Sequence, residues 1–329
     1  MRIFSGIQPT GRKHLGNYIG AILGYLDGQE RGDPAIYCIV DLHATSVPYD
    51  AQALPDCVYD TTAMLMAAGL DPERCILFRQ SDVKEHSELC WLLSSVTAYG
   101  DLQRMTQFKD KAGREQELVR TSLFLYPVLQ AADILLYKTD EVPVGEDQRQ
   151  HVELAREIAR RFNSTYGEVF VEAQAVVPAT GARIMDLQNP EAKMSTTGGT
   201  EAGLVYIDDE PEAIVRKIKR AQTDSGSEVV RAPDKAGITN LIEIYAVARG
   251  VEPEEVEHEF AGQGYGAFKE TVGEAIADLL GPVRERYLEL RADEAGIETA
   301  LERGAERARE IAVPVMAEVH AAMGLGAHA

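Results

Sequence analysis

The sequence has 329 residues, of which 45% are hydrophobic and 26% charged, a composition typical of a soluble globular protein with one large domain or two ordinary ones. Its formal net charge of −20 argues against indiscriminate binding to nucleic acids or membranes, although a local basic patch can still recognise one particular RNA. The N-terminus has no secretory signal pattern, and no apolar run reaches the ~20 residues of a membrane helix, so we expect a cytoplasmic location and no membrane partner.

The four cysteines are far apart in the sequence and contain no C-x-x-C pair: Cys38, Cys57, Cys75 and Cys90. Zinc and iron–sulfur sites normally use closely spaced ligands, and a free cysteine often behaves as a small apolar residue. We therefore expect all four to be reduced and structural, with no metal site made by the protein itself.

The chain opens with a short apolar strand, "MRIF", followed by the glycine-rich stretch "GIQPTGRKHLGNYIG" over residues 6–20. From Leu15 the apolar residues follow helical spacing, and Gly16, Gly20 and Gly24 form a stripe that would let this helix pack close to a sheet. A glycine inside a helix costs about 1 kcal/mol relative to alanine, so close approach of a ligand is one explanation. Such a strand–loop–helix turn can hold a nucleotide phosphate, to which His14 could donate. A packing turn with a chance histidine is the alternative.

Two more strands come next, with a helix between them. "AIYCIV" (35–40) is a β-rich run that ends at Asp41 and His43, residues 50–68 form a helix closed by Gly69, and "RCILFRQ" (74–80) is the third strand. This alternation predicts a parallel α/β unit, and ligands of such folds bind beyond the carboxyl ends of the strands. The opening stretch, His43 and Gln80 would all lie on that side.

Residues 84–138 are mostly helical, and "LFLYPVLQAADILLY" (123–137) carries a polar stripe of Tyr126, Gln130, Asp133 and Tyr137 on an otherwise apolar helix. A buried carboxylate needs a partner, because an unpaired one costs several kcal/mol. Either another side chain or a ligand can satisfy Asp133. The phenol and amide on the same stripe favour a ligand pocket.

"VPVGEDQ" places a glycine and acidic residues between a short strand and a helix. The acidic side chains can cap that helix, or Gly145 can admit a sugar while Asp147 binds ribose hydroxyls. Further on, "EAKMSTTGGTEAG" (191–203) has the composition of a loop whose lysine could close over a polyphosphate, and also that of an ordinary surface loop.

After Asp208 the sequence is almost entirely helical, with helices expected at 210–222, 237–249, 253–260, 267–291 and 297–323. We place a domain boundary near residue 190. The first domain, 1–190, is the α/β unit, and the second, 191–329, contains the lysine loop and a mainly helical domain whose last helix can pack back on the first.

Taken together and in this order, these segments resemble the bacterial tryptophanyl-tRNA synthetases. "FSGIQPTG" and "HLGNYIGA" match the family's HIGH region, "QRMTQFKDK", "YPVLQAADILLY", "VPVGEDQRQH" and "GARIM" match its central segments, and "KMSTT" occupies the KMSKS position. "TDS", "GITNL" and "GYGAFK" resemble its C-terminal half. The resemblance covers residue 3 to about 326. It implies a Rossmann-like catalytic domain, a helical tRNA anticodon-binding domain, and activation of tryptophan by ATP before transfer to tRNA-Trp.

The resemblance also implies roles for individual residues. For ATP, Gln8, Pro9, Thr10, Gly16 and Asn17 would line the site with His14 near the phosphates, while Gly145, Glu146, Asp147 and Ile184 hold the adenosine. Lys193 and Ser195 of the segment Lys193, Met194, Ser195, Thr196 and Thr197 would bind the pyrophosphate, Lys111 is a further candidate, and Mg²⁺ would accompany ATP. For tryptophan, Asp133 would accept the indole N–H, Phe4, Val40 and His43 would pack around the ring, and Tyr126 and Gln148 would take the ammonium.

Two positions depart from the family pattern. Thr196 replaces the second lysine of the KMSKS motif, which puts more weight on Lys193, Lys111 or magnesium, and Gln130 stands where many bacterial relatives have methionine. "RKIKR" (Arg216 to Arg220) is the clearest basic cluster and can be a solvated helix face or a contact to the RNA backbone. We also expect a homodimer through the apolar surface of residues 84–138.

Three other functions fit parts of the pattern. A tyrosyl-tRNA synthetase shares the architecture, but the aspartate of the polar stripe and the sequence "GEDQ" favour a tryptophanyl enzyme. A small nucleotidyltransferase would explain the turn around His14 but not the lysine loop or the long helical half. A catalytically idle paralogue that senses tryptophan or ATP is suggested only by Thr196.

Overall fold

The computed structural model describes residues 1–32, 34–105, 120–145, 148–176, 183–195 and 199–326. Within them, five parallel strands form one sheet in the order β3-β2-β1-β4-β5: β1 (Ile3–Ile7), β2 (Ala35–Ile39), β3 (Ile76–Arg79), β4 (Glu141–Pro143) and β5 (Gln174–Val176). The predicted α/β class with a parallel sheet is confirmed. The strand order reverses between β1 and β4, and in such sheets the ligand crevice lies at that reversal, beyond the carboxyl ends of the strands.

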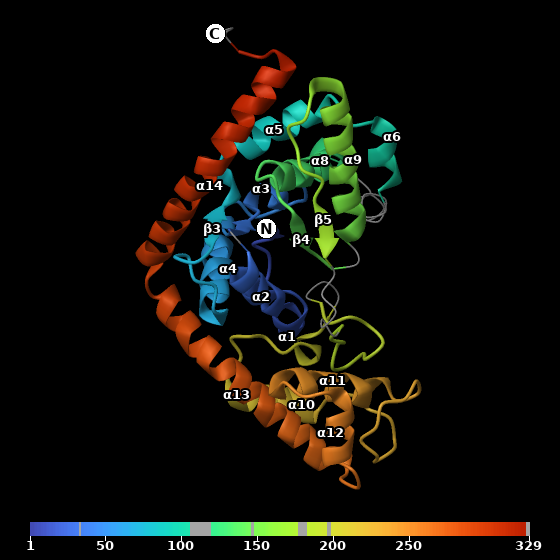
Figure 1. Cartoon of the computed structure of the whole chain (residues 1–329). Coiled ribbons are helices and arrows are strands. Elements are labelled where there is room, and N and C mark those ends of the chain that lie inside the picture. Colours follow the sequence, from blue (N-terminus) through green and yellow to red (C-terminus); the bar gives the residue numbers. More distant parts are fainter. Residues whose placement is uncertain (33, 106–119, 146–147, 177–182, 196–198, 327–329) are drawn as a thin grey trace.

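Helices cover both faces of this sheet (Figure 1). They are α1 (Leu15–Asn17), the π-helical turn η1 (Tyr18–Ile22), α2 (Leu23–Arg31), α3 (Asp41–Ala44), α4 (Leu54–Ala68), the 3₁₀ turn η2 (Gln80–Asp82), α5 (Glu85–Ser94), α6 (Tyr99–Arg104), α8 (Thr121–Leu135) and α9 (Arg149–Tyr166). Gly69, at φ +122°, ends α4 in a conformation that side chains rarely adopt, as its position in the sequence predicts.

The alternation of side chains along the strands divides the core in two. On β2, Ala35, Tyr37 and Ile39 pack with residues of α1, η1 and α4, while Ile36 and Cys38 pack with residues of α5, α8 and α9. Successive side chains of a strand point to opposite faces, so a strand buried on both sides reads as the continuous apolar run seen in the sequence.

After residue 200 the chain forms a second group of helices, which lie beneath the sheet up to α13, while α14 runs back up beside β3 (Figure 1). They are η4 (Glu201–Gly203), α10 (Pro211–Lys219), α11 (Ala236–Arg249), α12 (Pro253–Glu259), α13 (Tyr265–Arg291) and α14 (Glu294–Met323), close to the predicted spans. From Ala305 onwards α14 packs with the core of the α/β unit. The division into domains 1–190 and 191–329 stays a prediction.

Helix α14 crosses the edge strand β3 at very short range. A Cβ atom on Gly304 would lie 1.8 Å from the carbonyl oxygen of Leu77, so only glycine fits at this crossing. Around it, Arg79 of β3 makes a two-point ion pair with Glu298, and Arg309 donates to the carbonyl oxygen of Asp82. These contacts fasten the last helix to the strand and to the turn η2 that comes after it.

The expected glycine stripe is wrong in one respect. Gly20 lies on the exposed side of η1, and apart from its own helix backbone and chain neighbours no described atom lies within 4 Å of where its Cβ would be. The close approach occurs at Gly28, whose Cβ would lie 2.7 Å from the Tyr37 hydroxyl. The π-helical turn at Tyr18–Ile22 shifts the phase of the helix, and the sequence spacing gave no sign of it.

Within the described residues, no helix is both long enough and apolar enough to cross a bilayer.

Candidate active site

A cavity of about 290 Å³ opens at the strand reversal between β1 and β4. Its walls come from the carboxyl ends of β1, β2 and β4, from helix α8, and from the start of α9: Phe4, Ser5, Gly6, Gln8, Val40, His43, Gln130, Asp133, Ile134, Val142, Pro143, Val144 and Gln148. All but one of the residues predicted to surround tryptophan line it, together with Gln8. The exception is Tyr126, which is not among the lining residues.

Asp133 supplies the charge of this cavity. It is 1% exposed, and its Oδ1 accepts from Gln80 Nε2 at 2.6 Å and lies 2.7 Å from His86 Nδ1, while its Oδ2 lies 2.8 Å from His43 Nε2. Burial alone would raise the pKa of this carboxyl, but His43 and His86 together lower it to about 2. Asp133 is therefore a carboxylate across the physiological pH range, with a side chain of the cavity wall on only one of its two oxygens.

His86 is a residue that the sequence reasoning missed. It lies on α5, is completely buried, and joins Asp133 to Tyr137, whose hydroxyl is 2.7 Å from His86 Nε2. The one signal in the sequence was its position shortly after the third strand, comparable to that of His43 after the second. Tyr137, the last member of the predicted polar stripe, does not line the cavity and stacks on Phe4, which does, with ring centroids 5.6 Å apart.

Tyr126 lies beside the cavity wall. Its hydroxyl is 3.0 Å from His151 Nε2 of α9, and its ring meets the edge of the His43 ring at 6.5 Å between centroids. Burial raises the pKa of Tyr126 to about 12, so the phenol keeps its proton. The arrangement supplies a neutral hydroxyl beside the cavity wall, between His43 and α9.

His14 sits at the start of α1, where it caps the helix. Its Nδ1 accepts the backbone N–H of Asn17 at 3.3 Å, and its own N–H donates to Asn17 Oδ1 at 3.0 Å. Burial and the charges of Lys13 and Lys193 lower its pKa to about 4, so the ring is neutral near pH 7. Because Nδ1 accepts, the ring proton lies on Nε2, which leaves that nitrogen as a hydrogen-bond donor.

The loop between β1 and His14 is held from within. Lys13 Nζ donates to the carbonyl oxygens of Gln8 and Thr10, each at 3.0 Å, and burial lowers the pKa of this lysine to about 8. Gly11, at φ +63°, makes the turn between them. Pro9 is buried and Thr10 is exposed in this loop, and Gly145 lies just after β4 with its carbonyl oxygen accepting from the Gln148 N–H at 2.9 Å.

The predicted phosphate residues come from distant parts of the chain and meet beside α1. Lys193 pairs with Met185 in a short antiparallel bridge, and Met194 N–H donates to the carbonyl oxygen of Ile184 at 2.9 Å. A Cβ on Gly16 would lie 3.4 Å from Met194 Cβ, so the turn at His14 and this bridge are in contact. Ser195 is half-buried at the end of the bridge. Lys111, Glu146, Asp147, Thr196 and Thr197 lie outside the described residues.

Comparison with known proteins gives one consistent family. The family model described as tRNA synthetases class I (W and Y) matches residues 1–281. The chain is 47% identical over 328 residues to tryptophan–tRNA ligase 1 of Streptomyces coelicolor, with 98% of this chain and 97% of that protein covered. The chain belongs to the class I tRNA synthetases of the tryptophan and tyrosine family.

Solved structures of class I synthetases have the same fold over nearly the whole chain. A tryptophanyl-tRNA synthetase from Mycoplasma pneumoniae has a TM-score of 0.90 at 34% identity, covering 99% of this chain and 98% of that one. One from Campylobacter jejuni, complexed with ADP and tryptophan, has a TM-score of 0.84 at 33% identity, covering 99% and 100%.

In this class I synthetase the C-terminal motifs hold the segment that carries Lys193. Asn240 of "GITNL" accepts from Met185 N–H at 2.8 Å and donates to the Met185 carbonyl at 3.0 Å, so it clamps the strand that pairs with Lys193. Lys269 of "GYGAFK" donates to Thr223 Oγ1 at 2.9 Å, and Tyr265 donates to Asp224 at 2.9 Å. The motifs therefore form one connected support, which sequence reasoning could place in order but not in contact.

Proposed function

We propose that this class I synthetase is a tryptophan–tRNA ligase. The observation that carries the proposal is Asp133, a buried carboxylate with a cavity of side-chain size in front of it. Its cavity-facing oxygen, Oδ2, meets His43 and can accept one more hydrogen bond, so a ligand with an N–H donor on a flat apolar ring fits the site better than a wholly apolar one. Phe4 and Val40 supply the apolar walls for such a ring.

Tryptophan occupies this cavity with its indole N–H on Asp133 Oδ2. Its ammonium group lies toward Gln148 and the Tyr126 hydroxyl, and Gln130 adds an amide on the same wall. This orientation brings the tryptophan carboxylate toward Gln8 and the turn at His14. A carboxylate held in this position can react directly, without a covalent nucleophile from the protein.

In the first step a carboxylate oxygen of tryptophan attacks the α-phosphorus of ATP, and the bond to the bridging oxygen breaks to release pyrophosphate. His14 Nε2–H donates to the phosphates, and Lys193 and Ser195 stabilise the departing pyrophosphate together with Lys111. In the second step the terminal 2′-hydroxyl of tRNA-Trp attacks the activated carbonyl carbon, AMP leaves, and the hydroxyl proton passes to solvent.

Magnesium enters this reaction as part of the substrate. The described part of the chain contains no group of three His, Cys, Asp or Glu side chains placed to hold a metal ion. Mg²⁺ bound to the phosphates of ATP would offset their charge, and the protein would recognise the complex through Lys193 and His14.

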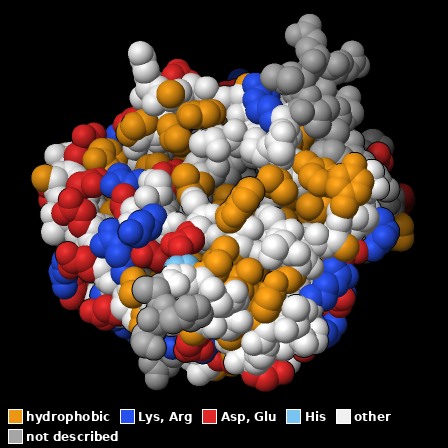
Figure 2. Space-filling view, turned by 90° about the horizontal axis from the view of Figure 1, so that it is seen from above, with side chains coloured by type: hydrophobic (Ala, Val, Ile, Leu, Met, Phe, Trp, Pro, Cys, Tyr) orange, Lys and Arg blue, Asp and Glu red, His pale blue; other side chains and the backbone are white. Residues whose placement is uncertain are grey.

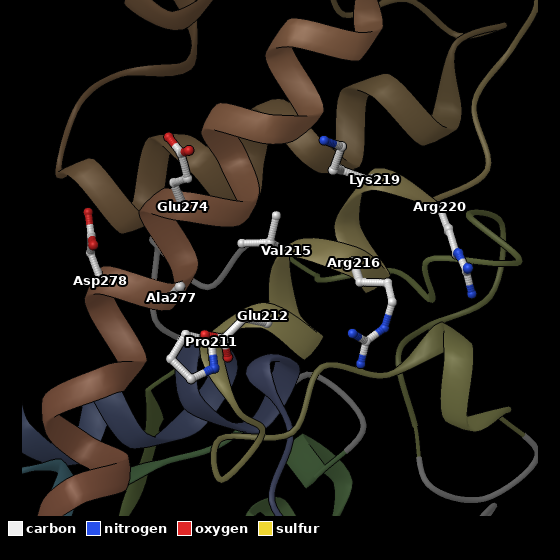
Figure 3. Close-up of a pocket in the computed structure, with 9 residues that line it drawn as sticks. All are labelled: Pro211, Glu212, Val215, Arg216, Lys219, Arg220, Glu274, Ala277 and Asp278. Atoms are coloured by element: carbon white, nitrogen blue, oxygen red, sulfur yellow. The ribbon is translucent and has the colours of Figure 1, made fainter.

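The basic segment on α10 is proposed as a tRNA contact through two of its five residues. Lys217 lies 2.7 Å from Asp209 and Lys219 lies 2.8 Å from Glu270, so these lysines are used within the protein. Arg216 and Arg220 are exposed, and no described acidic side chain forms an ion pair with either. Figure 3 shows their guanidinium groups pointing away from Glu274 and Asp278, which line the other side of the same groove of about 580 Å³. In an acidic chain these two cations suit RNA phosphates.

A homodimer is proposed through the face that carries α5 and α6. Trp91 on α5 is 78% exposed and Tyr99 on α6 is 66% exposed, which is unusual for rings of this size. Figure 2, which views this end of the molecule from above, shows hydrophobic side chains gathered on it. A cytoplasmic location stays a prediction.

The decisive experiment is ATP–pyrophosphate exchange with tryptophan, with tyrosine and with no amino acid in parallel. We expect exchange with tryptophan only. Exchange with tyrosine instead would make the chain a tyrosyl enzyme, and tryptophan binding without any exchange would identify an idle sensor.

A further inference from the structure

A line of three buried polar side chains runs from the tryptophan cavity into the core, and the proposed reaction uses only the first of them, Asp133. Tyr137 and His86 are fully buried, Asp133 is 1% exposed, and neighbouring polar atoms in the line are 2.7 Å apart at each junction. Only Asp133 lines the cavity; Tyr137 and His86 reach the ligand through it. Polar groups in so dry a place are costly unless each has a partner.

The positions of the protons in this line are set by chemistry. Burial raises the pKa of Tyr137 well above its usual value, so the phenol keeps its proton and donates it to His86 Nε2. A neutral imidazole that accepts at Nε2 carries its own proton on Nδ1, which then donates to Asp133 Oδ1. Gln80 Nε2 donates to the same oxygen, so Oδ1 receives two hydrogen bonds from behind.

The other oxygen of Asp133 is left for the cavity. Oδ2 meets His43 Nε2, and a carboxylate oxygen can accept two hydrogen bonds, so a ligand donor can be added. If His86 presented a lone pair to Asp133 instead of a proton, the carboxylate would be repelled from behind and would rotate. The Tyr137 hydroxyl prevents this, because its proton occupies the His86 nitrogen that a second tautomer would need.

We propose that Tyr137 and His86 are positioning residues for substrate specificity, which act as a one-way hydrogen-bond relay that fixes Asp133 as an acceptor for a ring N–H. This inference rests on the proposed function, because it assigns how the tryptophan site recognises its ligand. It predicts that the pair determines discrimination between tryptophan and ring analogues that lack a donor, more than the rate of adenylate formation at saturating tryptophan.

The test compares tryptophan with an analogue in which sulfur replaces the indole N–H. The measured quantity is kcat/KM for tryptophan divided by kcat/KM for the analogue, both in amino-acid-dependent ATP–pyrophosphate exchange. In Tyr137→Phe we expect this ratio to fall about tenfold, chiefly through a higher KM for tryptophan, with kcat within about twofold of the unchanged protein. His86→Leu should lower the ratio at least as far, whereas His86→Asn, which keeps an N–H near the position of Nδ1, should restore part of it.

Tyr37→Phe is the matched control. Tyr37 is equally buried and its hydroxyl donates to the carbonyl oxygen of Tyr25 at 2.5 Å, but it lies on the opposite face of the sheet. The control should lose stability without changing the ratio. A folded Tyr137→Phe protein with an unchanged ratio overturns the relay, even if His86→Leu does not fold. Absence of tryptophan-dependent exchange in the unsubstituted protein would instead refute the proposed function.

Discussion

The two sides of the active site are built in opposite ways. On the tryptophan side, Asp133 is 1% exposed and is held by three side chains from α3, η2 and α5. On the phosphate side, Lys193 is exposed, and no described acidic side chain forms an ion pair with it. A fixed, dry acceptor suits recognition of one ring, because a mismatch there is costly. An open cation suits a leaving group whose charge develops and departs.

The largest expected effect comes from removing the buried acceptor on the tryptophan side. In Asp133→Asn the amide N–H₂ would face at least one of the donors that now meet the carboxylate, so the cavity loses its acceptor. We expect kcat/KM for tryptophan in pyrophosphate exchange to fall about 10³-fold. Asp41→Asn is the control, since Asp41 is also buried at this sheet edge but accepts from the Ser81 backbone N–H and does not line the cavity. A loss below tenfold would mean that Asp133 does not contact the substrate.

Removing the exposed cation on the phosphate side, Lys193, should have a smaller effect, on kcat and not on KM. In Lys193→Ala we expect kcat for exchange to fall about 10²-fold with little change in KM for tryptophan, because the lysine acts on the transition state. Lys219→Ala, an exposed lysine paired with Glu270, should leave both constants unchanged. A rise in KM for tryptophan as large as the fall in kcat would show that the two sides are not separate.

The contrast between side chains held by partners and exposed cations also applies to the basic segment on α10 and its proposed tRNA contact. The double substitution Arg216→Glu and Arg220→Glu should raise KM for tRNA about tenfold and make its salt dependence shallower, with pyrophosphate exchange unaffected. Lys217→Glu should behave differently: it breaks the contact to Asp209 and therefore lowers the melting temperature. Equal damage to both reaction steps in the arginine variant would identify α10 as structural only.

A last expected effect concerns stability as a function of pH. Folding lowers the pKa of His14 from 6.5 to about 4, so between these values the unfolded chain binds more protons than the folded one. His14 therefore makes the free energy of unfolding fall as pH drops from 6.5 to 4, by at most about 1.4 kcal/mol for each pH unit. Urea unfolding at several pH values should show this slope, and it should be shallower in His14→Asn, which keeps the helix cap. An identical slope in both proteins would assign the effect to other groups.

The fold was largely predictable, because it depends on patterns that are local in sequence. The apolar runs at 35–40 and 74–80, the helix closed by Gly69, and the spacing of the later helices gave the order of elements within a few residues. The polar stripe on α8 pointed to Asp133, and the cavity lies in front of it. What local patterns could not supply was the phase shift at η1.

The supports of the site were not predictable, since they join residues far apart in the chain. Asn240 clamps Met185 from 55 positions away, and His86 reaches Asp133 from 47. The glycines of the Lys193 segment are another example. A Cβ on Gly203 would lie 2.2 Å from Asp186, so this glycine serves a close contact and not a loose surface loop. The partners of the two lysines in the basic run on α10 also lie elsewhere in the chain, so the sequence could not show which of its cations are used within the protein.

The contacts that fasten α14 to β3 and η2 have a consequence for when the protein folds during its synthesis. Gln80, which donates to Asp133, lies in the turn directly after β3. Two contacts with α14 hold that turn: Arg79 pairs with Glu298, and Arg309 of α14 donates to the Asp82 carbonyl oxygen. Domains fold from the N-terminus as the ribosome synthesises them, yet the turn that supports Asp133 waits for α14, the last helix of the described residues. We therefore expect a nascent chain to complete the support of its amino-acid pocket only after α14 has left the ribosome.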